Sequence, residues 1–498
     1  MATPALGQDP DFDADVIVVG GGNAAFTAAH AAAMRGRKVL LLEKAPRDQF
    51  GGNSYYTAGA TRIAHDGLDD LSDLIESDPR HPVTTVPPYS EAEYAEDIAK
   101  VTEGRNDEAM TKVLVTEAAD GLRWLKSLGL KYRLMYERQA YAREDGSYLF
   151  WGGLHVGNVG GGEGLMQDHL VVAEKLGTEV RFGQDVCGLL VDGTGAVVGV
   201  EVRANDGTVT EVRAESVILA AGGFESNARW RQEYLGDGWQ NAIVRGTPFN
   251  NGEMIQAALE VGAARGGDWG SCHSVQWDAN HAENESNREL TNRLTRQSYP
   301  LGIIVNNRGE RFLDEGADFR NLTYAKYGKV ILQQPDSIAY QVFDATLRPK
   351  LRAEEYEMPG ISEVVADSVE ELAEKLGVDA SALSKTVEEF NSSIDTTIPY
   401  DPNVLDGRSA NVVPPKSNWA MPLATAPFYA YPVTCGITFT FGGLKGNIDG
   451  QVLNEAGETL PGLFVCGEMF GGLFSGNYPG GSGLAAGVVF GRRAGSLA

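Results

Sequence analysis

The sequence predicts an α/β protein with two domains: a Rossmann-like domain that carries a β-meander insertion, and an α+β capping domain. Three observations support this fold class. The chain has 498 residues, which is more than one hydrophobic core usually organises. A strand, a glycine-rich turn, a helix and a second strand follow one another within residues 15–44. After residue 246 the composition changes to acidic helical segments with several prolines.

The segment 15–44 has the pattern of a βαβ unit that binds a dinucleotide. DVIVV at 15–19 has the apolar, β-branched character of a buried parallel strand, and Gly20, Gly22 and Ala25 form a G-x-G-x-x-A turn before an alanine-rich helix. Gly20 permits the bend, Gly22 lets a pyrophosphate approach the backbone, and Ala25 lets the helix pack closely on the strand. The turn therefore predicts a phosphate site at the N-terminus of the helix.

Glu43 lies near the end of the second strand of this unit, KVLLLEK at 38–44. A carboxylate at this position accepts hydrogen bonds from the hydroxyls of a ribose, and it would repel a 2′-phosphate. We therefore expect an adenosine ribose without a 2′-phosphate, which disfavours NADP.

The rest of the chain divides at two points. Residues 1–246 and 426–498 are expected to form the nucleotide-binding domain, and residues 247–425 the capping domain. Short alternating runs between 178 and 222 predict a meander of antiparallel strands inserted in the first part. The last part is expected to end in a helix that begins at Ser482 and faces the glycine turn with its N-terminus.

Composition excludes several classes of function. The formal net charge of -26 disfavours nucleic acid or an anionic membrane as a partner, and no apolar run reaches the roughly 20 residues of a membrane helix. The four cysteines and seven histidines show no spacing typical of an iron–sulfur cluster or another metal site. The N-terminal residues lack the features of a secretory signal, so we expect a cytoplasmic protein without a metal or membrane insertion.

Several tracts, in order along nearly the whole chain, resemble the fumarate reductase and succinate dehydrogenase flavoprotein superfamily. They are DVIVVGGGNAAFTAAHAA, GGNS at 51–54, AAGGF at 220–224, ERFLDE at 310–315, FVCGE and a terminal GGSGL. The tracts GGNSYYTAGATRIAH, ERFLDEGADFRNLTYAKYG and GITFTFGG resemble the tricarballylate dehydrogenase-like branch of this superfamily more than they resemble true fumarate reductases. The resemblance implies an FAD-dependent dehydrogenase or reductase that acts on a CH–CH bond of a small molecule, with an electron acceptor or donor that the sequence does not identify.

The resemblance also implies the residues that contact FAD. A histidine that tethers the flavin in succinate dehydrogenases is replaced here by Tyr55, Tyr56 and Thr57, so the FAD is expected to be non-covalent. The expected contacts are Gly20, Gly22, Asn23, Ala24, Ala25, Glu43, Lys44, Gly51, Gly52, Asn53, Ser54, Thr57, Gly59, Val186, Ala221, Gly222, Gly443, Gly467, Glu468, Gly481, Ser482 and Leu484.

Arg320 matches the arginine that delivers a proton to the substrate in fumarate reductases, although its spacing from the preceding tract is one residue longer. An arginine has a pKa above about 12, so a role as a clamp for a carboxylate is an equal alternative. Tyr324, four residues on, would share a helical face with Arg320 and is a candidate relay partner.

Two positions depart from fumarate reductases. A histidine is replaced by Phe439, and an arginine that grips a substrate carboxylate is replaced by Tyr478 in NYPGGSG. This tract resembles 3-ketosteroid dehydrogenases, in which the tyrosine hydroxyl polarises a ketone beside the oxidised bond, so Tyr478 is a third candidate catalytic residue. The expected substrate contacts are Arg62, Arg245, His273, Phe439 and Thr440.

Three functions remain open from the sequence. The first is a dehydrogenase of a tricarballylate-like di- or tricarboxylate, and the second is a dehydrogenase of a 3-ketosteroid or another cyclic enone. The third is a flavin-binding subunit that only transfers electrons. The charge of the pocket distinguishes the first two.

Overall fold

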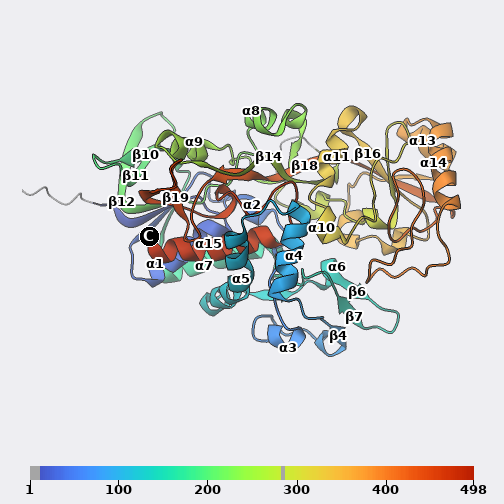
Figure 1. Cartoon of the computed structure of the whole chain (residues 1–498), viewed down its shortest axis with the longest axis horizontal. Helices are drawn as coiled ribbons and strands as arrows, with labels where there is room; N and C mark the ends of the chain where they lie inside the picture. Colours follow the sequence, from blue (N-terminus) through green and yellow to red (C-terminus); the bar gives the residue numbers. More distant parts are fainter. Residues whose placement is uncertain (1–11, 282–286) are drawn as a thin grey trace, which may run out of the picture.

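The structure is a computed structural model that describes residues 12–281 and 287–498. Residues 1–11 lie outside these ranges. The prediction that the N-terminal segment is not a secretory signal rests in part on them. The chain forms two large sheets, with helices around them and a smaller region of short strands below them in Figure 1. No helix of the described residues is long and apolar enough to cross a membrane.

The first sheet confirms the expected Rossmann-like core. Its strand order is β10-β11-β12-β1-β2-β9, with β20 beside β12 and β19 beside β20. Strands β1, β2, β9, β12 and β20 run parallel where they pair with one another, and β1 and β2 are buried almost throughout. The strands are β1 Ala14–Val19, β2 Val39–Glu43, β9 Glu179–Phe182, β10 Asp185–Val191, β11 Val197–Arg203, β12 Val209–Leu219, β19 Gln451–Leu453 and β20 Thr459–Val465.

The expected meander is present as the antiparallel strands β10, β11 and β12. One segment that we included in the alternating region behaves differently: β9, the run EVRF, pairs parallel with β2 at the edge of the main sheet. The long strand β12 links the two parts, because its last residues leave the meander and enter the parallel core between β1 and β20.

Two helices at opposite ends of the chain pack closely on one another under the first sheet. Helix α1, Asn23–Met34, lies against α15, Ser482–Leu497, which begins at the expected residue. Glycines recur every fourth residue on the face of α15 that meets α1, so the two backbones come into contact. A Cβ atom at Gly491 would lie 2.7 Å from the carbonyl oxygen of Ala24, and one at Gly495 only 2.1 Å from that of Ala28.

The second sheet belongs mainly to the capping region and is organised around the 17-residue strand β18, which pairs with β13, β14, β16 and β17. It contains strands from both sides of the expected boundaries at 246 and 425, which remain a prediction. The strands are β13 Ile243–Val244, β14 Arg265–Asp278, β15 Ile303–Asn306, β16 Ala339–Phe343, β17 Val364–Ala366 and β18 Phe428–Leu444. The helices around this sheet are α8 Ala228–Trp230, α9 Glu253–Glu260, α10 Arg320–Thr323, α11 Tyr327–Leu332, α12 Ala353–Tyr356, α13 Val369–Leu376 and α14 Ala380–Ser392.

The region between residues 52 and 176 brings further short elements to the junction of the two sheets (Figure 1). Its strands form two three-stranded sheets: β3 Ala60–Thr61, β5 Tyr132–Leu134 and β8 Val156–Asn158, and β4 Thr84–Thr85, β6 Ala140–Ala142 and β7 Tyr148–Phe150. Its helices are α2 Gly52–Tyr55, α3 Leu68–Leu71, α4 Glu91–Thr102, α5 Glu108–Leu128, α6 Tyr136–Gln139 and α7 Gly161–Leu176.

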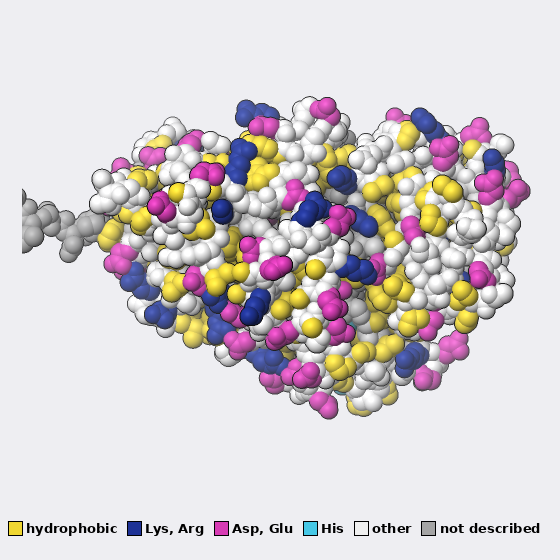
Figure 2. Space-filling model, viewed as in Figure 1, with side chains coloured by type: hydrophobic (Ala, Val, Ile, Leu, Met, Phe, Trp, Pro, Cys, Tyr) yellow, Lys and Arg dark blue, Asp and Glu magenta, His cyan; other side chains and the backbone are white. Residues whose placement is uncertain are grey.

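The surface is consistent with the negative net charge. On the face shown in Figure 2, acidic side chains are spread over the molecule, and lysines and arginines lie interspersed among them rather than in one patch. This face therefore offers no evident surface for a polyanion.

The contact between α1 and α15 generates a first prediction. A Gly495→Leu substitution should destabilise the fold by about 1–3 kcal/mol or more, because the new side chain overlaps the backbone of Ala28. A lowered midpoint of thermal unfolding, followed by circular dichroism, would show this. Ser496→Ala, at the next and more accessible position, should leave the midpoint nearly unchanged, and equal midpoints for both variants would contradict the proposed tight contact.

Candidate active site

An elongated cavity, here called the nucleotide cavity, lies over the glycine turn. It is lined by residues 19–24, 42–44, 52–54 and 220–222, together with Val186 and Glu468. Gly20 has a φ of 115°, and a Cβ atom there would lie 2.3 Å from the carbonyl oxygen of Ala220, so only glycine fits at the bend.

The N-terminus of α1 has the features of a phosphate-binding site. The N-cap residue Gly22 has no side chain to cap this helix, and of the first N–H groups that of Asn23 donates to Ser54 Oγ at 3.0 Å, so the N–H groups that follow are left for an anion. A Cβ atom at Gly22 would meet nothing closer than Ser54 Oγ at 3.5 Å, so the glycine leaves open space beside these N–H groups. The residues present therefore fit the pyrophosphate of a dinucleotide.

Glu43 lines the same cavity, as expected for a residue that binds a ribose, and its carboxylate lies beside the glycine turn, since a Cβ atom at Gly21 would lie 2.3 Å from Glu43 Oε2. Its side chain is 6% exposed, and Oε1 accepts a hydrogen bond from the Ala45 N–H at 2.6 Å. Burial raises the pKa of Glu43 to about 7, because it disfavours the ionised carboxylate. Hydrogen bonds from ribose hydroxyls would stabilise that ionised form. Lys44 also lines the cavity, but its ammonium group is paired with Asp185 and Glu253.

A second cavity, here called the inner cavity, continues from the first towards the capping region. The two share Asn23, Ala24, Asn53, Ser54, Gly467 and Glu468. This continuity matches a cofactor whose adenosine half occupies the nucleotide cavity and whose ring system reaches the inner one. Of the other expected FAD contacts, Thr57, Gly481 and Leu484 line the inner cavity, whereas Ala25, Gly51, Gly59, Gly443 and Ser482 line neither cavity.

The inner cavity holds two guanidinium groups that lack an acidic partner among the described residues. Arg320 donates hydrogen bonds to Gln297 Oε1 at 2.7 Å and Gln139 Oε1 at 3.0 Å, both neutral acceptors. Arg245 is 7% exposed and donates to Thr438 Oγ1 at 2.9 Å and to Asn292 Oδ1. Burial lowers the pKa of both groups, that of Arg320 to about 9.

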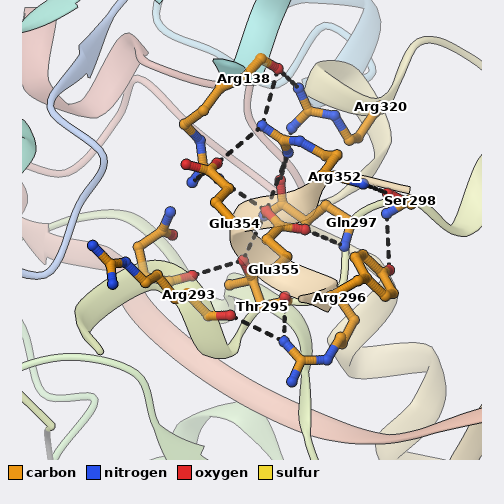
Figure 3. Close-up of polar contacts among 12 residues, drawn as sticks. Arg138, Arg293, Thr295, Arg296, Gln297, Ser298, Arg320, Arg352, Glu354 and Glu355 are labelled. Atoms are coloured by element: carbon orange, nitrogen blue, oxygen red, sulfur yellow. Dashed lines mark hydrogen bonds and ion pairs between the residues drawn. The ribbon is translucent and has the colours of Figure 1, made fainter. Parts of the chain in front are cut away.

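Arg320 belongs to a larger cluster of arginine and glutamate side chains, which Figure 3 shows. Arg138 pairs with Glu354 at 2.5 Å and with Glu355 at 3.0 Å, and Arg352 pairs with Glu355 at 3.2 Å. Two carboxylates thus face three guanidiniums, and the nearby charges of Arg352 and Arg138 contribute to the low pKa of Arg320. The cluster retains one positive charge, and Arg320 is the member without an ion pair.

Aromatic side chains form another wall of the inner cavity. The hydroxyls of Tyr324 and Tyr478 are hydrogen-bonded at 2.5 Å, and Phe439 meets Tyr478 edge to face with a centroid distance of 5.1 Å. Burial raises the pKa of both phenols, so both are protonated at neutral pH. One hydroxyl can donate to the other while the second remains free to donate to a substrate oxygen.

The structure brings together most of the residues expected at the active site. Arg245, Arg320, Tyr324, Phe439, Thr440 and Tyr478 all line the inner cavity. Tyr324 contacts Tyr478 rather than Arg320, so a direct relay between Arg320 and Tyr324 is not formed.

Two expected substrate residues occupy other positions. Arg62 is fully buried beside the cavity, where it pairs with Asp97 at 3.0 Å and donates to Tyr89 and to backbone carbonyls, and it does not line the cavity. His273 lies behind the aromatic wall, where it stacks on Phe439 at 5.1 Å. Burial and the charge of Arg245 lower the pKa of His273 well below its usual value, so it is neutral.

Several lining residues were missed from the sequence, among them Arg138, Gln139, Asn292 and Gln297. Arg138 and Gln139 come from the short helix α6, and Asn292 and Gln297 from an irregular segment of the capping region. No periodicity or motif marked these segments, because their role depends on contacts between distant parts of the chain.

Comparison with known proteins identifies the group to which these features belong. A family model described as FAD binding domain matches residues 15–484. The chain is 28% identical to a probable fumarate reductase of Shewanella frigidimarina (strain NCIMB 400), over 99% of this chain and 76% of the relative.

Two further proteins are similar to this chain, one in sequence and one in fold. A 4-oxocyclohex-2-ene-1-carboxylate 5-dehydrogenase of Sinomonas cyclohexanicum is 31% identical, over 61% of this chain and 53% of that protein. The solved structure of 3-ketosteroid Δ1-dehydrogenase from Sterolibacterium denitrificans has the same fold, with a TM-score of 0.74, 21% identity and coverage of 97% of this chain and 99% of that chain.

The nucleotide cavity generates a second prediction. Gly22→Val should abolish FAD binding while the protein stays folded, because the new side chain fills the phosphate space without overlapping the protein. The visible absorbance of the purified variant checks this, with its circular dichroism as evidence of folding. Gly193→Val, in a turn where a Cβ atom meets nothing within 4 Å, is the matched control, and a yellow Gly22→Val protein would contradict the assignment.

Proposed function

The chain belongs to the FAD-binding family whose model it matches, within the fumarate reductase and succinate dehydrogenase flavoprotein superfamily, and on this premise we propose that its substrate is a di- or tricarboxylate. The protein is an FAD-dependent dehydrogenase or reductase that acts on carbon–carbon bonds. In the proposed reaction, the bond that gains or loses hydrogen lies beside a carboxylate. Bound FAD supplies the exchange of a hydride.

One observation carries this proposal: Arg245 and Arg320 line the same cavity without an acidic partner among the described residues. Enclosing a guanidinium costs several kcal/mol unless an opposite charge or hydrogen bonds compensate it. Their amide and hydroxyl partners satisfy some of the donors but leave both charges available. Two carboxylates of one substrate would complete both sites.

The protein's own residues then have defined roles. Arg245 and Arg320 bind and orient carboxylates, and Gln139 and Gln297 hold the guanidinium of Arg320 in place. The lowered pKa of Arg320 also makes it a better proton donor than an ordinary arginine, so both roles considered for it, clamp and proton donor, are compatible with its position. Tricarballylate-like substrates are the finer assignment that the sequence resemblance favours.

A second candidate substrate is a cyclic ketone or enone. The observation that favours it is the hydrogen-bonded pair Tyr324 and Tyr478, which can donate to a carbonyl and stabilise the charge that develops on its oxygen. The aromatic wall with Phe439 would pack against a ring. The similarity to the Sinomonas dehydrogenase supports including a compound that carries both a ketone and a carboxylate.

The experiment is anaerobic reduction of the bound flavin by a panel of compounds, followed at its visible absorbance. The panel comprises tricarballylate and succinate, cyclohexanone and a 3-ketosteroid, and 4-oxocyclohexanecarboxylate. We expect carboxylates to bleach the flavin. Arg245→Ala and Arg320→Ala should each weaken the binding free energy of the carboxylate by about 2–5 kcal/mol, because each removes one partner of a buried charge pair.

One control and two further outcomes make the experiment decisive. Arg203→Ala, on the exposed end of β11, should behave as the unmodified protein. Bleaching by ketones alone, with loss in Tyr478→Phe, would replace the carboxylate assignment by the ketone one. Steady turnover of the purified chain with an artificial electron acceptor would rule out a subunit that only transfers electrons.

The pKa of Arg320 generates a prediction about pH. Below its pKa of about 9 the guanidinium is charged and binds a carboxylate; above it the group loses its proton and its attraction. We therefore expect kcat/KM for a carboxylate substrate to fall as the pH rises through about 9, because kcat/KM reports the free enzyme. An unchanged kcat/KM up to pH 10 would show that the pKa of Arg320 is not lowered to this range.

A further inference from the structure

We propose that Glu225 and Glu468 form a carboxyl pair that shares one proton and takes up a second proton when the bound flavin is reduced. This inference goes beyond the proposed function, because it concerns the cofactor rather than the substrate. It rests on the family assignment and would survive a change of substrate class.

Glu225 is fully buried and lines neither cavity, but it contacts Asn53, which lines both. Its Oε1 accepts hydrogen bonds from Asn53 Nδ2 and Asn250 Nδ2, both at 2.6 Å. Its Oε2 is also buried, and it accepts no hydrogen bond from an N–H or a hydroxyl of the described residues. The neighbouring carboxyl, when protonated, is the donor that remains for it. One oxygen of Glu225 is therefore fixed as an acceptor, and the other is left for Glu468.

Glu468, in the turn after β20, lies close enough to Glu225 for each carboxyl to affect the pKa of the other. Its Oε1 accepts from the Thr440 N–H at 2.8 Å and from Thr440 Oγ1 at 3.2 Å. The space is tightly filled, since a Cβ atom at Gly223 would lie 2.1 Å from Glu468 Oε1. Both carboxyls are thus held in place by donors on their outer oxygens.

No lysine, arginine or histidine among the described residues forms an ion pair with either carboxyl. Arg231 comes nearest, but its Nη1 donates to the backbone carbonyl of Glu225, and the other titratable neighbour is the buried thiol of Cys272. Two carboxylates in contact cannot both be ionised without a nearby cation, so they retain a proton between them. Consistently, burial raises the pKa of both groups, and the charge of Glu225 raises that of Glu468 further.

The pair is connected to the cofactor site on both sides. The carboxyl of Glu468 and the side chain of Asn53, which binds Glu225, both belong to the stretch of wall that the two cavities share. Hydride transfer brings two electrons and one proton to FAD and so adds one negative charge next to a pair that already carries one. Uptake of one proton from solvent makes the pair neutral and restores the original charge of the site.

The experiment is to measure the midpoint potential of the bound flavin against pH in the holoprotein and in the double variant Glu225→Gln/Glu468→Gln. The double variant is needed because either carboxyl, left alone, could still take up a proton, whereas two glutamines keep the size of the pair and leave no carboxyl to titrate. Each proton taken up with two electrons adds about 30 mV per pH unit to the slope. We expect the slope of the unmodified protein to exceed that of the double variant by this amount.

Glu260→Gln is the matched control, because it removes the same charge from an exposed position on α9 and should keep the full slope. Equal slopes in the unmodified protein and the double variant would overturn the proposal. If the double variant fails to retain FAD, an infrared difference spectrum of the unmodified holoprotein, reduced minus oxidised, decides instead. A gain of the band of a protonated carboxyl supports uptake, and the absence of any carboxyl change overturns it.

Discussion

Positive charge enclosed at the junction of the two large sheets is the constraint on which the rest of the active site depends. Arg138, Arg320 and Arg352 face only two carboxylates, Glu354 and Glu355 (Figure 3). Such a cluster is stable without its anion only because amide and carbonyl oxygens satisfy the remaining donors. The excess charge is therefore built into the folded protein before any substrate arrives.

The same contacts also hold the capping region against the rest of the protein. Arg138 lies on α6, whereas Arg320, Arg352 and both glutamates belong to the capping region. Arg320 and Arg352 donate to the backbone carbonyl of Arg138, at 3.3 and 2.9 Å, and the side chain of Arg138 reaches back to Glu354 and Glu355. An anion that binds Arg320 therefore acts on a network that spans the junction between the capping region and the rest of the protein.

The sequence alone predicted the features that repeat a local pattern. The buried strands, the glycine turn with Glu43, the meander and the helix beginning at Ser482 each have a signature within a short stretch, and the structure confirms them. The features it missed have no such signature. Arg138 comes from one turn of helix in a loop-rich region. Glu225 follows a glycine tract in which only Ala221 and Gly222 were predicted to contact FAD.

Arg62 illustrates the opposite error. It follows the GGNS tract closely and was expected to bind substrate, but its partner Asp97 lies on α4, and no local pattern indicates that this helix packs there. Whether a buried arginine is free or paired depends on contacts between distant segments. Residue type and position along the chain could therefore suggest which arginines lie near the site, but not which of them keep an unpaired charge.

The charges of the two cavities have a consequence for the direction of electron flow. Unpaired guanidiniums line the inner cavity, and the carboxyl pair of Glu225 and Glu468 lies where this cavity meets the nucleotide cavity. A hydride that leaves a substrate for the cofactor carries negative charge away from the arginines and towards the carboxyls. Electrostatics alone would oppose that transfer and favour the reverse. Substrate oxidation in this arrangement therefore requires protons to follow the electrons. Reduction of a double bond would instead be favoured by the electrostatic potential of these charged side chains.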